Sequence, residues 1–62
     1  MKWLIFTKEI KHRGKMLFWD KKEKNWFEGY LVDDSEYGLV ISLYETYRTL
    51  KDISHYMLIN TP

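Results

Sequence analysis

The sequence has no cysteine, one proline and only three glycines among its 62 residues. Without cysteine the chain has no disulfide, no thiolate metal ligand and no cysteine nucleophile, and a reducing compartment such as the cytoplasm fits this composition. No apolar run reaches the roughly 18 residues that a membrane-spanning helix needs. The apolar stretch after Met1 is broken by charge and lacks the small-residue cleavage site of a signal peptide. We therefore expect a cytoplasmic protein that does not act at a membrane.

Aromatic residues are abundant instead: three Trp, five Tyr and three Phe make up 18% of the chain, and 45% of its residues are hydrophobic. This length corresponds to a single domain over residues 1–62. A chain of this size buries only about 60% of the surface that its unfolded form exposes, so each large side chain matters for stability. Aromatic rings bury the most area per residue. The composition therefore predicts a small folded domain that needs no disulfide, metal or cofactor.

Short segments rich in β-branched and aromatic residues alternate with polar turns, which favours an all-β fold. The expected strands cover residues 2–10, 15–20, 26–32, 39–44 and 56–59. Residues 21–25 read as a hairpin loop with Asn25 in a left-handed conformation, and Gly29 predicts a bulge or sharp bend. Residues 33–38 read as a turn whose carboxylates cap backbone N–H groups. Such strands predict a small five-stranded barrel, in which closure removes exposed sheet edges.

Residues 43–58 leave two alternatives open. Apolar and aromatic residues recur three or four positions apart, at Leu43, Tyr47, Leu50, Ile53 and Met57. This spacing is typical of an amphipathic helix and predicts an α+β fold, a four-stranded antiparallel sheet with a C-terminal helix over residues 43–58. The many β-branched and aromatic residues of the same segment favour a turn near residues 50–53 and a closing strand. We expect the all-β fold.

Residues 27–43 resemble the first sequence motif of Sm-like proteins, in which a spaced glycine and an acidic turn join two apolar strands. The matching positions are Phe27, Gly29, Leu31, Asp33 or Asp34, Leu39 and Ile41. Src-homology-3-like barrels share this hairpin, so the resemblance implies a Src-homology-3-like (Sm-like) barrel, with ring formation and RNA binding as the implied function. The chain departs from the family at Tyr37-Gly38, where Sm-like proteins have an asparagine for base recognition. It also lacks the glycine of their second motif in residues 49–54.

Charge is uneven along the chain although the formal net charge is only +1. Residues 1–24 hold eight Lys or Arg against three acidic residues, a net of +5. Residues 25–62 hold two basic residues against six acidic ones, a net of −4. This asymmetry fits either a phosphate-binding face or an electrostatic contact with a protein partner, including a head-to-tail contact between copies.

Candidates for catalysis are few. Asp52 and His55 form an oriented general base only if a helical turn places them side by side. Asp33, Asp34 and Glu36 lack the spacing of a dedicated calcium loop and read as turn residues. We therefore expect no catalytic residues, no metal site and no enzymatic activity.

Binding is the stronger class of function, because the chain has more aromatic residues than one small core can bury. Neighbours along a strand point to opposite faces, so one member of each of the pairs Phe18-Trp19 and Trp26-Phe27 should face outward. Outward Trp and Tyr side chains are typical anchors of protein interfaces. The candidate protein-binding residues are Trp3, Trp19, Trp26, Tyr30, Tyr37 and Tyr47. The leading hypothesis is a non-enzymatic module that binds a protein or a second copy of itself. Small size alone adds the hypothesis of an accessory or inhibitor protein from a phage or virus.

Single-stranded RNA or DNA is the alternative partner, since lysines contact phosphates and Trp rings stack on unpaired bases. The candidate residues for this alternative are Lys11, Arg13, Lys15, Trp19, Lys21, Lys22, Lys24 and Trp26. A continuous surface shared by these basic and aromatic side chains would favour nucleic acid. An apolar aromatic patch away from the lysines would favour protein contact.

Overall fold

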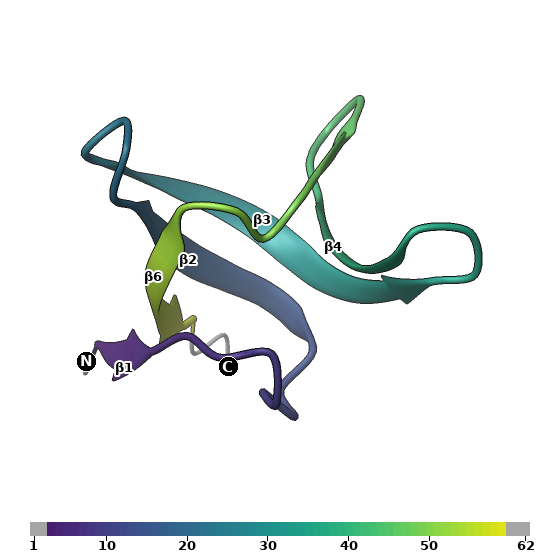
Figure 1. Cartoon of the computed structure of the whole chain (residues 1–62), viewed down its shortest axis with the longest axis horizontal. Helices are drawn as coiled ribbons and strands as arrows, with labels where there is room; N and C mark the ends of the chain where they lie inside the picture. Colours follow the sequence, from purple (N-terminus) through teal and green to yellow (C-terminus); the bar gives the residue numbers. More distant parts are fainter. Residues whose placement is uncertain (1–2, 60–62) are drawn as a thin grey trace.

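The computed structural model describes residues 3–59, which form one six-stranded antiparallel sheet (Figure 1). The strands are β1 (Leu4–Ile5), β2 (Gly14–Asp20), β3 (Asn25–Asp34), β4 (Gly38–Ser42), β5 (Tyr47–Arg48) and β6 (Ile53–Leu58). Their order across the sheet is β1-β6-β2-β3-β4-β5. The described part of the chain contains no helix, and so none that is long and apolar enough to cross a membrane.

The hairpin of β2 and β3 is the centre of the sheet. Its register runs without interruption from Gly14 opposite Leu31 to Asp20 opposite Asn25, and residues 21–24 form the loop. The left-handed residue of this loop is Lys24, with φ of 57°. The prediction for Asn25 was therefore wrong by one position, because Asn25 already pairs with Asp20 as the first residue of β3.

Gly29 does not form a bulge, which was one of the two features that the sequence predicted for this position. It pairs with Met16 in an unbroken register, and the register shift of the sheet lies between Trp19 and Asp20, where β2 meets β6. Gly29 is instead a point of close approach, because a Cβ atom there would lie 2.6 Å from Cγ2 of Ile41. The sheet coils tightly enough at this position that β3 has no room for a side chain.

The helix alternative for residues 43–58 is wrong. This segment forms β5, a turn at residues 50–52 and β6. Strand pairing decides against a helix, because β6 is hydrogen-bonded between β1 and β2, and from there Ile53 and Tyr56 join the buried cluster. The turn and the closing strand that the sequence favoured are confirmed, although β6 begins earlier than predicted, at Ile53.

The first predicted strand is much shorter than expected. Within residues 2–10 only Leu4–Ile5 is a strand, and Met1 and Lys2 lie outside the described residues. Phe6 still donates its N–H to the carbonyl oxygen of Ser54 at 2.9 Å, after which the chain turns, with the N–H of Ile10 donated to Thr7 at 3.2 Å. Ile10 is thereby buried in the core.

The core lies on the inner side of the coiled sheet. Met16, Phe18, Leu31 and Ile41 are completely buried there. Partly buried residues from across the sheet pack against this cluster, namely Leu4, Phe6, Phe27, Leu39, Leu43 and Leu50. Residues from β1 and from the segment just after β5 therefore share one core, although β1 and β5 are the two edges of the sheet.

Candidate functional site

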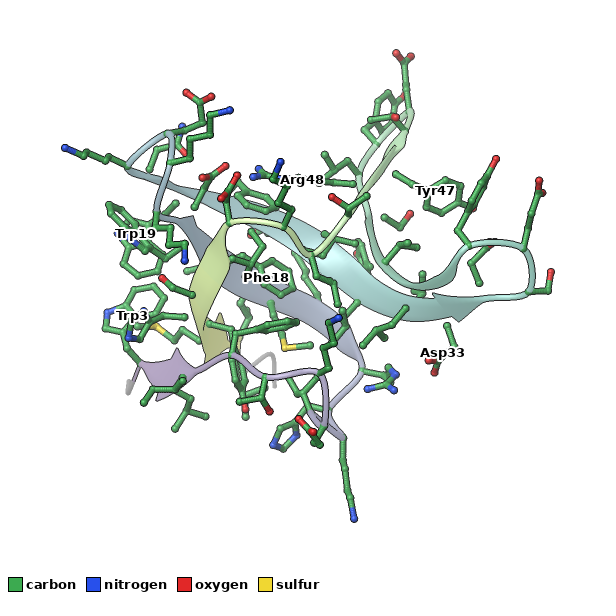
Figure 2. The ribbon with its side chains drawn as sticks, in the orientation of Figure 1. Trp3, Phe18, Trp19, Asp33, Tyr47 and Arg48 are labelled. Atoms are coloured by element: carbon green, nitrogen blue, oxygen red, sulfur yellow. The ribbon has the colours of Figure 1, made fainter. Side chains whose placement is uncertain are left out.

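The three tryptophans gather on the outer side of the sheet, although Trp3 is distant from the other two in sequence. Figure 2 shows two of them, Trp3 and Trp19, at the same edge of the molecule. Trp19 and Trp26 face each other across β2 and β3, with ring centroids 4.5 Å apart. Trp3 stacks on Trp26 with centroids 3.5 Å apart and an interplanar angle of 18°. We call Trp3, Trp19 and Trp26 the tryptophan cluster. Trp3 and Trp26 remain 38% and 42% exposed, so the cluster is both ordered by its own contacts and accessible.

Strand alternation explains why these rings point outward. Phe18 is completely buried and Phe27 packs partly buried beside it, with ring centroids 5.5 Å apart. Their neighbours Trp19 and Trp26 must then project to the opposite face. The prediction that each aromatic pair divides between the two faces is confirmed.

The outer apolar surface continues from the tryptophan cluster toward β1. Trp19 lies opposite His55 on β6, and His55 lies opposite Ile5 on β1. Directly opposed residues of antiparallel strands project to the same face, so Ile5, His55 and Trp19 form one row with Trp26. Ile5 is 74% exposed. The surface thus crosses four strands and ends on a short edge strand.

A loop with three lysines borders the tryptophan cluster. Only the pair of Asp20 and Asn25 lies between the pair of Trp19 and Trp26 and the loop of residues 21–24. We call Lys21, Lys22 and Lys24 the lysine loop, and none of them forms an ion pair with a described residue. Half of the basic residues proposed for nucleic-acid binding are therefore next to Trp19 and Trp26.

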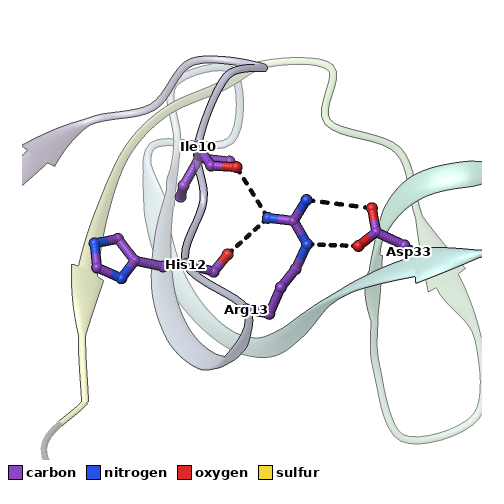
Figure 3. Close-up of polar contacts among 4 residues, drawn as sticks. All are labelled: Ile10, His12, Arg13 and Asp33. Carbon is purple, nitrogen blue, oxygen red and sulfur yellow. Dashed lines mark hydrogen bonds and ion pairs between the residues drawn. The ribbon is translucent and has the colours of Figure 1, made fainter.

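The other basic candidates lie elsewhere. Arg13 makes a bidentate ion pair with Asp33, at 2.8 and 3.2 Å, and donates to the carbonyl oxygens of Ile10 and His12 (Figure 3). The hydrogen bond between Arg13 and Asp33 lowers the pKa of the carboxyl and raises the pKa of the guanidinium. Lys15 pairs with Glu28 at 3.2 Å.

Arg13 and Lys15 stand at the opposite end of β2 from the lysine loop, about 20 Å away at the rise of an extended strand. Lys11 lies in the exposed segment that leads into β2. The structure therefore divides the six basic candidates between the two ends of the β2–β3 hairpin.

The tyrosine candidates form a second aromatic area. Tyr37 and Tyr47 have ring centroids 6.2 Å apart, and with Val40 and Thr49 they line an open groove of about 420 Å³. Tyr30 projects from the middle of β3 and is half exposed, opposite Ser42 and Lys15. The six protein-binding candidates thus separate into the tryptophan cluster, the tyrosine groove and Tyr30 between them.

A buried ion pair of Asp20 and Arg48 supports the lysine loop, and the sequence analysis missed it. Asp20 is 1% exposed, and Oδ1 accepts the N–H groups of Lys22 at 2.9 Å and Glu23 at 3.0 Å. Oδ2 accepts a hydrogen bond from Nη2 of Arg48, whose guanidinium lies 4.4 Å from the ring centroid of Phe27. The N–H of Glu23 foremost, and then Arg48, lower the pKa of Asp20. An aspartate before a polar loop was a readable turn signal, whereas nothing local marked Arg48 as its partner.

The candidates for chemistry are not assembled into a site. His55 Nδ1 lies 2.9 Å from Oγ of its neighbour Ser54, and β6 replaces the helical turn that would have aligned His55 with Asp52. Asp34 accepts the N–H groups of Glu36 and Tyr37 through Oδ2, at 2.8 and 2.9 Å, which confirms its predicted capping role. Within residues 3–59 no three His, Asp or Glu side chains are grouped as metal ligands.

Comparison with known proteins gives no match: no family model matches the chain, and no curated protein or solved structure is significantly similar to it. The resemblance of residues 27–43 to Sm-like proteins thus rests on those residues, which form the hairpin of β3 and β4.

Proposed function

We propose that this chain is a non-enzymatic binding module that acts through protein–protein contact. The observation that carries the proposal is the tryptophan cluster, three contacting rings on the outer face of a sheet, of which Trp3 and Trp26 are exposed. Trp side chains dominate the binding energy of many protein interfaces because they bury a large area at low cost in conformational entropy. Here each ring is already held by another ring, which lowers that cost further.

The finer fold proposed with this function is a small Src-homology-3-like (Sm-like) barrel that is only partly closed. In support, the sheet coils until residues next to both of its edges pack on one core. A barrel of this kind is a rigid platform, because the side chains beneath the tryptophan cluster are the buried aromatic rings of the core. We propose that the protein acts in the cytoplasm, which its lack of cysteine fits, and that it is an accessory or inhibitor protein of phage or viral origin.

Single-stranded nucleic acid is the second candidate partner, favoured by the lysine loop beside Trp19 and Trp26. Two observations favour protein instead. Trp3 covers a face of Trp26 that a base would need for stacking. Arg13 and Lys15 are engaged with carboxylates and lie at the far end of β2.

Affinity capture with three baits tests the proposal: the wild-type chain, Trp26→Ala and Tyr44→Ala. Tyr44 is 97% exposed and lies in the turn between β4 and β5, so it is a matched aromatic control. We expect a protein that wild type and Tyr44→Ala retain, that Trp26→Ala loses, and whose capture survives nuclease treatment. Capture that is indifferent to Trp26→Ala would contradict the proposal. Loss of capture after nuclease treatment would favour the nucleic-acid alternative.

A further inference from the structure

The backbone of the lysine loop is held in place by the protein itself. Each of residues 21–24 donates its N–H group within the chain. Two of these N–H groups are bonded to Oδ1 of Asp20, at 2.9 and 3.0 Å. A third is bonded to the carbonyl oxygen of Asp20 at 2.8 Å, and the fourth to the carbonyl oxygen of Asp52 at 2.9 Å. The loop therefore presents its lysines from an ordered backbone, so little backbone entropy is lost when a partner binds there.

The carboxylates close to the lysine loop do not cancel its charge. Asp20 is 1% exposed and belongs to the buried ion pair described above. Glu28, two residues after Trp26, is held in an ion pair of its own. Asp52 directly follows Lys51, so the turn that supports the loop adds no net negative charge. The loop itself has three lysines and one glutamate, all exposed, which leaves a net of +2 beside the tryptophan cluster.

The tryptophan cluster adds a hydrogen-bond donor to this basic border. The indole N–H of Trp19 makes no hydrogen bond with a described residue, and no buried side-chain nitrogen in that part of the chain lacks a partner. The N–H of Trp19 therefore reaches the surface. Indole N–H groups and lysine ammonium groups donate hydrogen bonds and accept none. The surface shared by the cluster and the loop is thus complementary to acceptors, and carboxylates form the strongest hydrogen bonds with such donors.

Resting on the protein-contact function proposed above, we infer that the partner presents an acidic segment, in which Asp or Glu side chains flank an apolar anchor. The anchor packs on the exposed rings of Trp3 and Trp26, and the carboxylates contact the lysine loop. A polypeptide suits this surface better than a nucleic acid, because Trp3 covers a face of Trp26 at 3.5 Å and no base can stack there.

The two parts of this contact have different physical roles. The anchor and the tryptophan rings supply the buried apolar area, and so most of the affinity. The lysines and carboxylates set the orientation of the segment and its association rate. Because the lysines are exposed, added salt should weaken the binding.

Selection of binders from a displayed library of random peptides on the purified full chain tests the inference. We expect the enriched peptides to carry an excess of Asp and Glu beside an aromatic or aliphatic residue. All three tryptophans of the chain lie in the cluster, so its intrinsic fluorescence reports on this site alone. Titration with an enriched peptide should change this fluorescence, with an affinity that falls as salt is added.

Charge variants test the contribution of the lysine loop. Lys21→Glu/Lys22→Glu should weaken binding of the enriched peptides about tenfold or more, whereas Lys21→Arg/Lys22→Arg should bind like wild type. Lys8→Glu/Lys11→Glu is the matched control. It makes the same change in net charge at exposed residues that precede β2, whose other end leads into the lysine loop, and it should also bind like wild type. Circular dichroism and thermal unfolding of each variant verify that the fold is retained.

Three results would overturn the acidic segment: a library that yields no enriched peptide, enriched peptides without an excess of Asp and Glu, or binding that Lys21→Glu/Lys22→Glu leaves unchanged. Tighter binding of a short single-stranded oligonucleotide in the same fluorescence titration would also overturn it, in favour of nucleic acid. Any of the first three results, together with protein capture that depends on Trp26, leaves the binding module intact. Capture that is indifferent to Trp26→Ala overturns the proposed function as well.

Discussion

The substitution Gly29→Ala tests whether tight coiling of the sheet forms the platform under the binding surface. An added Cβ atom would lie 2.6 Å from Cγ2 of Ile41 and 3.1 Å from Cδ2 of Leu43. Ile41 is completely buried, and its Cγ2 is bonded directly to Cβ, so this methyl group cannot swing away without a new side-chain rotamer. The neighbouring strand must therefore shift.

The expected effect is a net loss of stability. Forcing an extra methyl into a packed core costs about 1–3 kcal/mol, whereas replacing glycine by alanine restricts the unfolded chain and returns about 0.4–1 kcal/mol. The free energy of unfolding should thus fall by about 1–2 kcal/mol. For a domain of this size each kcal/mol corresponds to about 4–8 °C in Tm, so we expect Tm to fall by roughly 5–15 °C.

Urea and thermal unfolding of a double-mutant cycle measure this effect. Ile41→Ala removes the clashing methyl group and should by itself cost about 2–5 kcal/mol. In that background Gly29→Ala should cost little or nothing. Gly38→Ala is the control, because Gly38 has φ of 78° and open space around its Cα, so its cost should be the same with and without Ile41. An equal penalty for Gly29→Ala in both backgrounds would refute the close-contact argument.

Three further predictions concern the lysine loop and the charged pairs. Lys24→Gly should raise the free energy of unfolding by about 0.5–1 kcal/mol. Lys24 has φ of 57°, and the left-handed conformation costs a residue with a Cβ about 1–2 kcal/mol, whereas the greater freedom of glycine in the unfolded chain offsets part of the gain. A lower Tm for this variant would contradict the prediction. Acid should destabilise the fold, because the pKa values of Asp20 and Asp33 are lower in the folded chain than in the unfolded one. The unfolded chain therefore binds protons more readily. The stability that these two carboxylates contribute is present above the ordinary pKa of 3.8 and is lost as the pH falls through their lower folded values. Urea titrations between neutral pH and pH 3 should show this loss, smaller in Asp20→Asn; an unchanged acid limb would exclude the role of Asp20. Arg48→Met should cost more stability than Lys15→Met, because it leaves a buried carboxylate without its cation whereas the Lys15 pair is half exposed; equal midpoints in urea would show that the buried pair is dispensable.

Features that depend on neighbouring residues were predictable from the sequence. The alternation of Phe18 and Trp19 placed one ring in the core and the other outside, because strand geometry alone sets these directions. The turn at residues 33–38 was readable for the same reason, since Asp34 caps N–H groups two and three residues ahead. Even so, the left-handed residue of the loop is Lys24 and not Asn25 as predicted, because Asn25 already pairs with Asp20 as part of β3.

The sequence by itself determined the central hairpin, one outward ring in each of the pairs Phe18-Trp19 and Trp26-Phe27, and a charge asymmetry, and it favoured an all-β chain over one with a C-terminal helix. Only the tertiary structure decided which distant segments meet. Residues 43–58 fit a helix or strands by their spacing, and pairing of β6 between β1 and β2 settled the matter. In the same way Trp3 stacks on Trp26 and Arg48 pairs with Asp20 because the coiled sheet brings them together. Such contacts depend on how the whole chain closes around one core, and no local pattern of residues encodes them.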